Sequence, residues 1–159
     1  MVFLAAILGK RRGSSIARAA ADGSYAKPFR PNRSTFDWLC RDNTVVDDYV
    51  ADPRCGILCS VGFYRDMAKG LLRIHEHEVM SRIRRDLPIY VICGSADPVG
   101  EMGTSPTSLV NAYRSLGIKD LEFVLYPGAR HEVLNETNRE EVMGNLLSWI
   151  HRHTSYGKE

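Results

Sequence analysis

Two short runs decide the fold of this chain: Ile89-Tyr90-Val91-Ile92-Cys93, closed by Gly94, and Leu121-Glu122-Phe123-Val124-Leu125-Tyr126, closed by Pro127-Gly128. Such apolar runs, rich in β-branched and aromatic residues, are typical of strands that are covered on both faces, as in a parallel sheet. Between them, apolar residues recur at helical spacing over 108–116, and Gly117 follows where a left-handed cap residue is wanted. The sequence therefore predicts a βαβ unit with parallel strands.

A last helix is predicted to begin near Asn138, because Asn138 and Glu141 have the spacing of a capping box. Its inward face is expected to carry Val142, Leu146, Leu147 and Ile150. Two strands are few for an α/β domain, whose sheet usually has about five or six. Because these strands are too apolar to leave their edges in water, we expect another segment or a second copy to cover them.

The first 87 residues have a different sequence pattern from the rest of the chain, and the change falls near Leu87-Pro88. Helical spacing predicts one helix over 44–50 and another over 61–74. Gly, Ser, Pro and basic residues over 13–31 predict mostly loop. The sequence thus predicts helices joined by turns, followed by a C-terminal βαβα unit.

Composition narrows the classes of partner. The 159 residues include 21 Lys and Arg and 19 Asp and Glu, and a net charge of +2 gives no reason to expect nucleic acid or an anionic membrane. The apolar stretch 2–8 is far too short for a transmembrane segment, and its basic residues follow it, unlike those of a secretory signal. The four cysteines form no C-x-x-C pair, which predicts free thiols and a cytoplasmic location.

The loops after the two strands carry the residues that could do chemistry. Asp97 lies four residues past Cys93, and His131 lies five residues past Tyr126. Because neighbouring parallel strands lie about 5 Å apart, these loops can bring the carboxylate to the imidazole. An Asp that accepts from one ring nitrogen leaves the other free to take a proton from a nucleophile. Alternatively, Asp97 is a turn residue that bonds its own backbone, and His131 is simply exposed.

Both loops resemble the C-terminal end of α/β-hydrolases. The segments are Gly-Ser-Ala-Asp-Pro-Val-Gly over 94–100 and Tyr-Pro-Gly-Ala-Arg-His-Glu-Val-Leu-Asn-Glu over 126–136, and the likeness is to the monoacylglycerol lipase, lysophospholipase and serine aminopeptidase-like group. In that group the triad runs Ser, Asp, His, and Asp97 and His131 match its second and third members. Residues 29–39 and 49–53 resemble the cap of such an enzyme.

The resemblance implies a partial α/β-hydrolase fold: a helical cap (lid) segment over 1–87, and the C-terminal part of the core over 88–159. The nucleophile half is absent, since no G-x-S-x-G occurs. The nearest misses hold Ser15, which follows the basic residues 10–12 rather than a strand, and Ser105, which comes after Asp97 and violates the chain order. The oxyanion donors of the family are missing as well.

The implied reaction is hydrolysis of a carboxylic ester, such as a monoacylglycerol or lysophospholipid, without a metal or organic cofactor. Asp97 and His131 would supply the acid and base, and the chain alone would be inactive. Its partner would be the missing N-terminal hydrolase half or a second copy of the chain. Four aromatic residues would line the acyl-chain pocket, although a cap core explains them equally well: Phe36, Trp38, Phe63 and Tyr64.

Two other interpretations stay open. The chain could be a non-catalytic relic of a hydrolase that binds a ligand or a protein without turnover. A zinc site could be drawn from Cys55, Cys59, His75 and His77, but their spacing matches no common zinc module.

Overall fold

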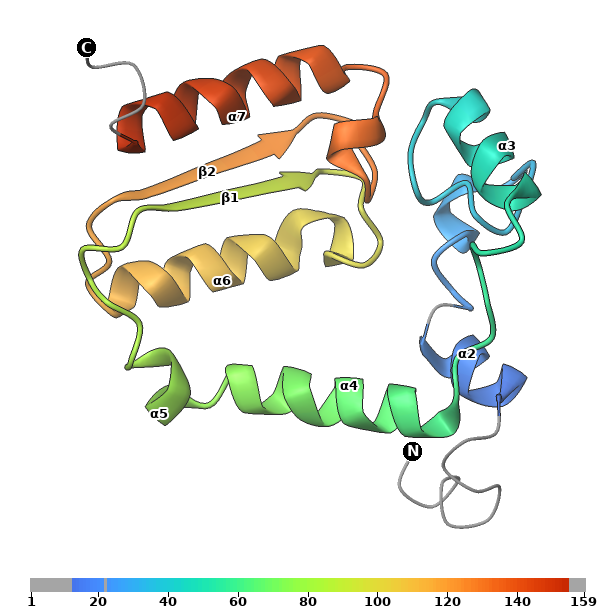
Figure 1. The fold of residues 1–159 in the computed structure, drawn as a ribbon, viewed down its shortest axis with the longest axis horizontal. Coiled ribbons are helices and arrows are strands. Elements are labelled where there is room, and N and C mark those ends of the chain that lie inside the picture. The colour runs from blue at the N-terminus through green and yellow to red at the C-terminus, as the bar shows by residue number, and fades with distance from the viewer. Residues whose placement is uncertain (1–12, 22, 155–159) are drawn as a thin grey trace.

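The computed structural model describes residues 13–21 and 23–154. Among them, β1 (Ile89–Gly94) and β2 (Leu121–Tyr126) form a parallel two-stranded sheet, with Ile89 opposite Leu121 and Gly94 opposite Tyr126. Helix α6 (Thr104–Ser115) lies on one face of the sheet and α7 (Arg139–His153) on the other (Figure 1). The predicted βαβα unit is confirmed, with one helix on each face of the sheet; the strand residues before Gly94 and Tyr126 are half-buried.

Helix α6 begins four residues earlier than the predicted range. The short 3-10 helix η2 (Glu101–Gly103) precedes it, and Gly103 takes a left-handed conformation with φ 89° before the first helical residue. Pro106 is tolerated within the first turn, because backbone amides there have no helical acceptor. At the other end, Gly117 has φ 81°, as its predicted role in a left-handed cap requires.

Helix α7 begins at Arg139, but the predicted capping box does not form. The Asn138 side chain caps no backbone amide, and instead donates to Glu141 Oε2 at 2.9 Å. Val142 is buried beside Tyr126, Ala129 and Val133 in the small core. The predicted inward face is wrong for Leu147 and Ile150, which are exposed, because a two-stranded sheet covers only part of the helix.

The segment before the sheet is helical, as predicted. It contains α3 (Asn43–Ala51), α4 (Val61–Ile74) and α5 (His77–Met80), together with the short 3-10 helix η1 (Lys27–Phe29). A further helix, α2 (Ser15–Ala21), corrects the prediction of mostly loop over 13–31. Its sequence, Ser-Ile-Ala-Arg-Ala-Ala-Ala, is rich in alanine, which has the highest helix propensity.

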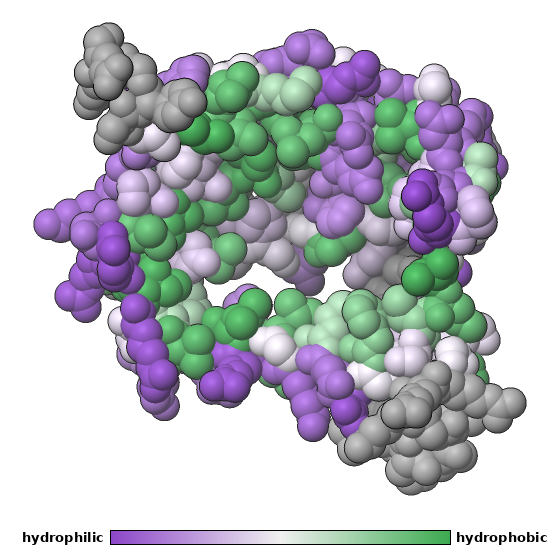
Figure 2. All heavy atoms as spheres, viewed as in Figure 1, coloured by the Kyte–Doolittle hydropathy of each residue, from purple (hydrophilic) through white to green (hydrophobic). Residues whose placement is uncertain are grey.

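The apolar face of α4 lies open in this chain. Phe63, Met67, Leu71 and Ile74 recur at helical spacing, and each is exposed, Phe63 to 52 %. Figure 2 shows hydrophobic residues along this helix, on the side that faces an opening between α4 and the sheet layer. Across residues 13–21 and 23–154, no helix has the length and apolar character that a bilayer span requires.

Candidate active site

Asp97 and His131 meet where the two strands end. The Nδ1 atom of His131 lies 3.2 Å from Oδ1 and 3.1 Å from Oδ2 of Asp97. The predicted proximity is therefore confirmed: the loops after neighbouring parallel strands bring the carboxylate against one nitrogen of the ring. Asp97 is buried, whereas the His131 side chain is 38 % exposed.

Backbone contacts fix both loops. The Oδ1 atom of Asp97 accepts from the Val99 amide at 2.9 Å, and the Ala96 amide donates to the Ala129 carbonyl at 2.8 Å. Gly94 makes this crossing possible. A Cβ atom there would lie 2.1 Å from the Ala129 oxygen and 2.2 Å from the Arg130 oxygen, so no side chain fits where β1 passes under the His131 loop.

The local electrostatics shift the pKa of Asp97 and that of His131 in opposite directions. Burial alone raises the pKa of Asp97, but hydrogen bonds from His131 and from the Val99 amide outweigh it and hold the pKa below its usual range. The hydrogen bond to Asp97 raises the pKa of His131, although burial opposes this. Asp97 is therefore negative at neutral pH, and it stabilises the cationic form of His131.

Cys93 is close to this pair but is not a nucleophile. Its Sγ atom lies 3.7 Å from Asp97 Oδ2. Burial, followed by the charge of Asp97, raises the pKa of the thiol to about 11. Because the thiolate is the reactive form, Cys93 stays inert at neutral pH.

The four predicted pocket aromatics do not gather in one place. Phe36 and Trp38 line a cleft of about 350 Å³ with Ser15 and Arg18, and the Trp38 ring lies 5.2 Å from the His131 ring, centroid to centroid. Phe63 and Tyr64 are instead on α4, where their rings lie 5.5 Å apart, and neither lines this cleft. Trp38 thus connects the cleft to the imidazole.

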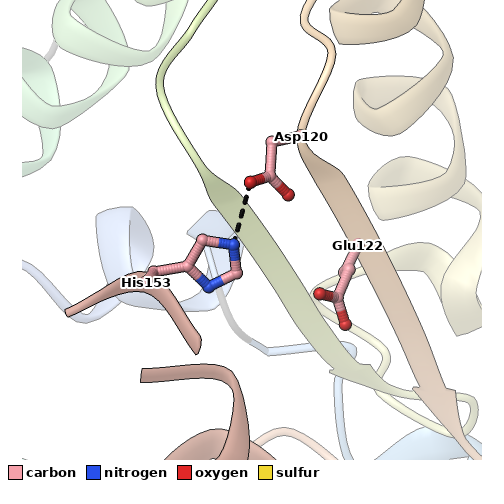
Figure 3. A group of neighbouring side chains, drawn as sticks. All are labelled: Asp120, Glu122 and His153. Carbon is pink, nitrogen blue, oxygen red and sulfur yellow. Dashed lines mark hydrogen bonds and ion pairs between the residues drawn. The ribbon is translucent and has the colours of Figure 1, made fainter. Parts of the chain in front are cut away.

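A second imidazole and carboxylate meet at the opposite end of the strands, where β2 begins (Figure 3). His153 Nε2 lies 2.8 Å from Asp120 Oδ2, and His153 Nδ1 lies 2.7 Å from the Trp149 carbonyl. Both ring nitrogens face oxygen acceptors, so neither is free to take a proton from a nucleophile. Glu122 completes a group that could surround a cation, but Arg152 holds both of its oxygens, at 2.7 and 2.8 Å.

The weaker sequence candidates form no hydrogen bond with the His131 ring among the described residues. Ser15 is the first residue of α2, and Ser105 bonds Glu101 from the first turn of α6. Cys55, Cys59, His75 and His77 are not among the groups that could hold a metal ion within the described part of the chain.

Sequence reasoning missed the residue that anchors the His131 loop. Glu136 is fully buried and accepts four hydrogen bonds. The one signal in the sequence is that Glu136 ends the run 126–136 that resembles α/β-hydrolases; nothing local predicts its burial.

Carboxylate and imidazole after successive parallel strands, at the carboxyl edge of a sheet covered by helices, define the chain as part of an α/β-hydrolase. The family model for serine aminopeptidase, S33, matches residues 1–138, so the chain belongs to this family. No curated protein sequence matches the chain.

Three solved structures show the same fold. They are a carboxyl esterase from Bacillus coagulans in complex with glycerol (TM-score 0.83, 22 % identity, 94 % of this chain), a lipase in its open form (0.85, 25 %, 95 %), and a soluble variant of monoglyceride lipase from Saccharomyces cerevisiae with a substrate analogue (0.61, 19 %, 88 %). The chain spans about half of each, namely 49 %, 49 % and 50 %.

Proposed function

We propose that this chain supplies the acid and base of a serine hydrolase for carboxylic esters, with Asp97 and His131 as two members of its triad. The observation that carries the proposal is the contact between Asp97 and a single ring nitrogen of His131. With Nδ1 donating to the carboxylate, Nε2 has the lone pair that a general base needs.

The chemistry follows from this geometry. His131 takes the proton of a serine hydroxyl as the oxygen attacks the ester carbonyl, and then returns the proton to the leaving alkoxide. Asp97 holds the ring and stabilises its cationic form in between. We place the serine and the oxyanion donors outside this chain, because the sequence contains no G-x-S-x-G and no hydroxyl of the described residues is hydrogen-bonded to the His131 ring.

The missing half would dock on the apolar surface described above. The sheet of the described residues has only two strands, α4 exposes its apolar face, and each compared structure is about twice as long as the matched part. A parallel strand beside the present sheet and an apolar layer against α4 would satisfy both surfaces. In this proposal residues 1–87 are the cap and residues 88–159 the C-terminal part of the core.

The cleft beside Trp38 favours an ester with an apolar acyl chain. Phe36 and Trp38 offer apolar walls to an acyl chain, and the contact of Trp38 with His131 places one end of the cleft near the base. The compared structures are those of a carboxyl esterase, a lipase and a monoglyceride lipase. We therefore propose a monoacylglycerol or lysophospholipid as the substrate class.

The test uses the chain alone and the chain mixed with a separately produced N-terminal half of a family member, here called the completed enzyme. We expect the chain alone to hydrolyse no p-nitrophenyl ester and to resist a fluorophosphonate probe, and the completed enzyme to gain both properties. Labelling of the pure chain by the probe would contradict the proposal.

The rival proposal is a non-catalytic relic that binds a ligand or a protein through the same cleft and surface. It is favoured by the absence of the G-x-S-x-G nucleophile motif from the sequence. A complex that forms with the N-terminal half yet hydrolyses no ester would support the relic.

A further inference from the structure

Glu136 is the most deeply buried carboxylate among the described residues outside the Asp97–His131 pair. It follows the 3-10 helix η3 (Val133–Asn135), and none of its surface is exposed. A buried carboxylate is strongly unfavourable unless charge and hydrogen bonds compensate it. Both oxygens of the Glu136 carboxylate accept hydrogen bonds, and the donors identify the segments that the residue holds together.

Four N–H groups share the two carboxylate oxygens. Oε1 accepts from the Arg130 amide at 2.7 Å and from the Arg41 amide at 3.2 Å. Oε2 accepts from Arg41 Nε at 2.8 Å and from the Thr137 amide at 3.1 Å. The donors therefore come from the His131 loop on one side and from the cap segment on the other.

These two segments also pair directly. The His131 amide donates to the Trp38 carbonyl at 3.4 Å, and the Glu132 amide donates to the Leu39 carbonyl at 2.7 Å. The Arg130 guanidinium reaches the carbonyls of Asp37 and Cys40. Glu136 thus bonds Arg130, just before His131, and Arg41, three residues after Trp38 in the cap segment.

We propose that Glu136 is a positioning residue for His131, holding the imidazole against Asp97 and in register with Trp38 through the Arg130 and Arg41 amides. This inference rests on the proposed function, and it adds a coupling between the cap and the base. Glu136 shows no hydrogen bond to His131 itself, so its effect on the ring passes through the backbone.

Glu136→Gln is the informative variant, because it keeps the side-chain size. A glutamine offers one carbonyl oxygen, while its NH₂ group would face N–H donors, so up to half of the four hydrogen bonds are lost. We expect the His131 loop to loosen and the ring to leave its optimal position beside Asp97. A displacement of about 1 Å at a catalytic group can cost on the order of 100-fold in rate.

The decisive experiment is a pH titration of the His131 imidazole by ¹⁵N NMR on the chain itself. We expect Glu136→Gln to lower the pKa of His131 toward its ordinary value, because the Asp97 hydrogen bond that raises it weakens. In the completed enzyme, kcat should fall on the order of 100-fold while KM changes by less than about twofold. The exposed Glu140→Gln, in the first turn of α7, is the matched control and should leave all three quantities unchanged.

The outcomes are separable. A folded Glu136→Gln chain with an unchanged His131 pKa would make Glu136 merely structural and overturn the inference. If that variant does not fold, Arg41→Lys is used instead, because it removes the Nε donor and keeps the charge. We expect it to lower the pKa of His131 in the same direction, by a smaller amount. If the completed wild-type enzyme is inactive, the proposed function fails, but the titration still decides the role of Glu136.

Discussion

The structure allows the effect of Gly94→Ala to be predicted quantitatively. Its Cβ atom would lie 2.1 Å from the Ala129 oxygen and 2.2 Å from the Arg130 oxygen, and both atoms are backbone. To restore a separation of 3.0 Å, the His131 loop must retreat by about 0.9 Å. Overpacking of this kind typically costs roughly 1–3 kcal/mol of folding free energy. The retreat also moves His131 away from Asp97, which is worth on the order of 100-fold in rate.

The assay is urea unfolding followed by tryptophan fluorescence, together with NMR titration of His131. We expect a lower urea midpoint for Gly94→Ala and a His131 pKa closer to its ordinary value. Gly144→Ala in α7 is the control: apart from its own chain neighbours and the helix backbone, nothing lies within 4 Å of the added Cβ, and removing a helical glycine should stabilise the chain by up to about 1 kcal/mol. A Gly94→Ala chain with the wild-type midpoint and His131 pKa would refute this reasoning.

Three further predictions follow from the same contacts. The Asp97–His131 pair should stabilise the fold fully between about pH 3.9 and 6.5. The stability that comes from the lowered pKa of Asp97 is lost as pH falls through that pKa, and the stability that comes from the raised pKa of His131 is lost as pH rises through that one. Urea midpoints measured across pH should show this window, and Asp97→Asn should remove it. Leu71→Asp on the open face of α4 should weaken binding of the N-terminal half at least tenfold by isothermal titration, whereas Leu72→Asp, off that stripe, should not; equal effects would argue against docking there. Ser15→Ala should leave kcat for ester hydrolysis by the completed enzyme unchanged, although Ser15 lines the cleft and KM can shift; a loss of fluorophosphonate labelling in this variant would make Ser15 the nucleophile.

The parallel unit was predictable because its signals are local. Apolar runs that end before Gly94 and Pro127 predict two strands. The loops that follow them then begin at the same edge of the sheet. The meeting of Asp97 and His131 then follows from the spacing of parallel strands. Their catalytic roles remain a prediction, because the contact establishes only that the two side chains meet.

Other features depend on contacts that no local pattern reports. The Asn138 capping box fails because that side chain accepts from Arg41, 97 positions away, and donates to Glu141. Leu147 has helical spacing for a core face, yet it is exposed where the small sheet gives it no cover. The burial of Glu136 is not reported by its neighbours in the sequence, because two of its four donors, the Arg41 amide and Arg41 Nε, lie 95 positions away.

The two histidine–carboxylate contacts differ in how many ring nitrogens are hydrogen-bonded, and this difference distinguishes a candidate base from a structural histidine. His131 uses one ring nitrogen for Asp97, whereas His153 uses both, one for Asp120 and one for the Trp149 carbonyl. In both residues the pKa is raised: chiefly by the hydrogen bond to Asp97 for His131, and chiefly by the hydrogen bond to the Trp149 carbonyl for His153. The free nitrogen, rather than the direction of the pKa shift, separates the candidate base from the structural residue.

The central claim is that His131, oriented by Asp97, is the base of an ester hydrolase. The most direct measurement is kcat for ester hydrolysis by the completed enzyme with His131 or with His131→Ala. We predict a fall of about 10²- to 10⁴-fold, the usual contribution of a general acid–base group, with substrate binding retained. A completed enzyme that turns over its ester at the wild-type rate without the imidazole would contradict the account.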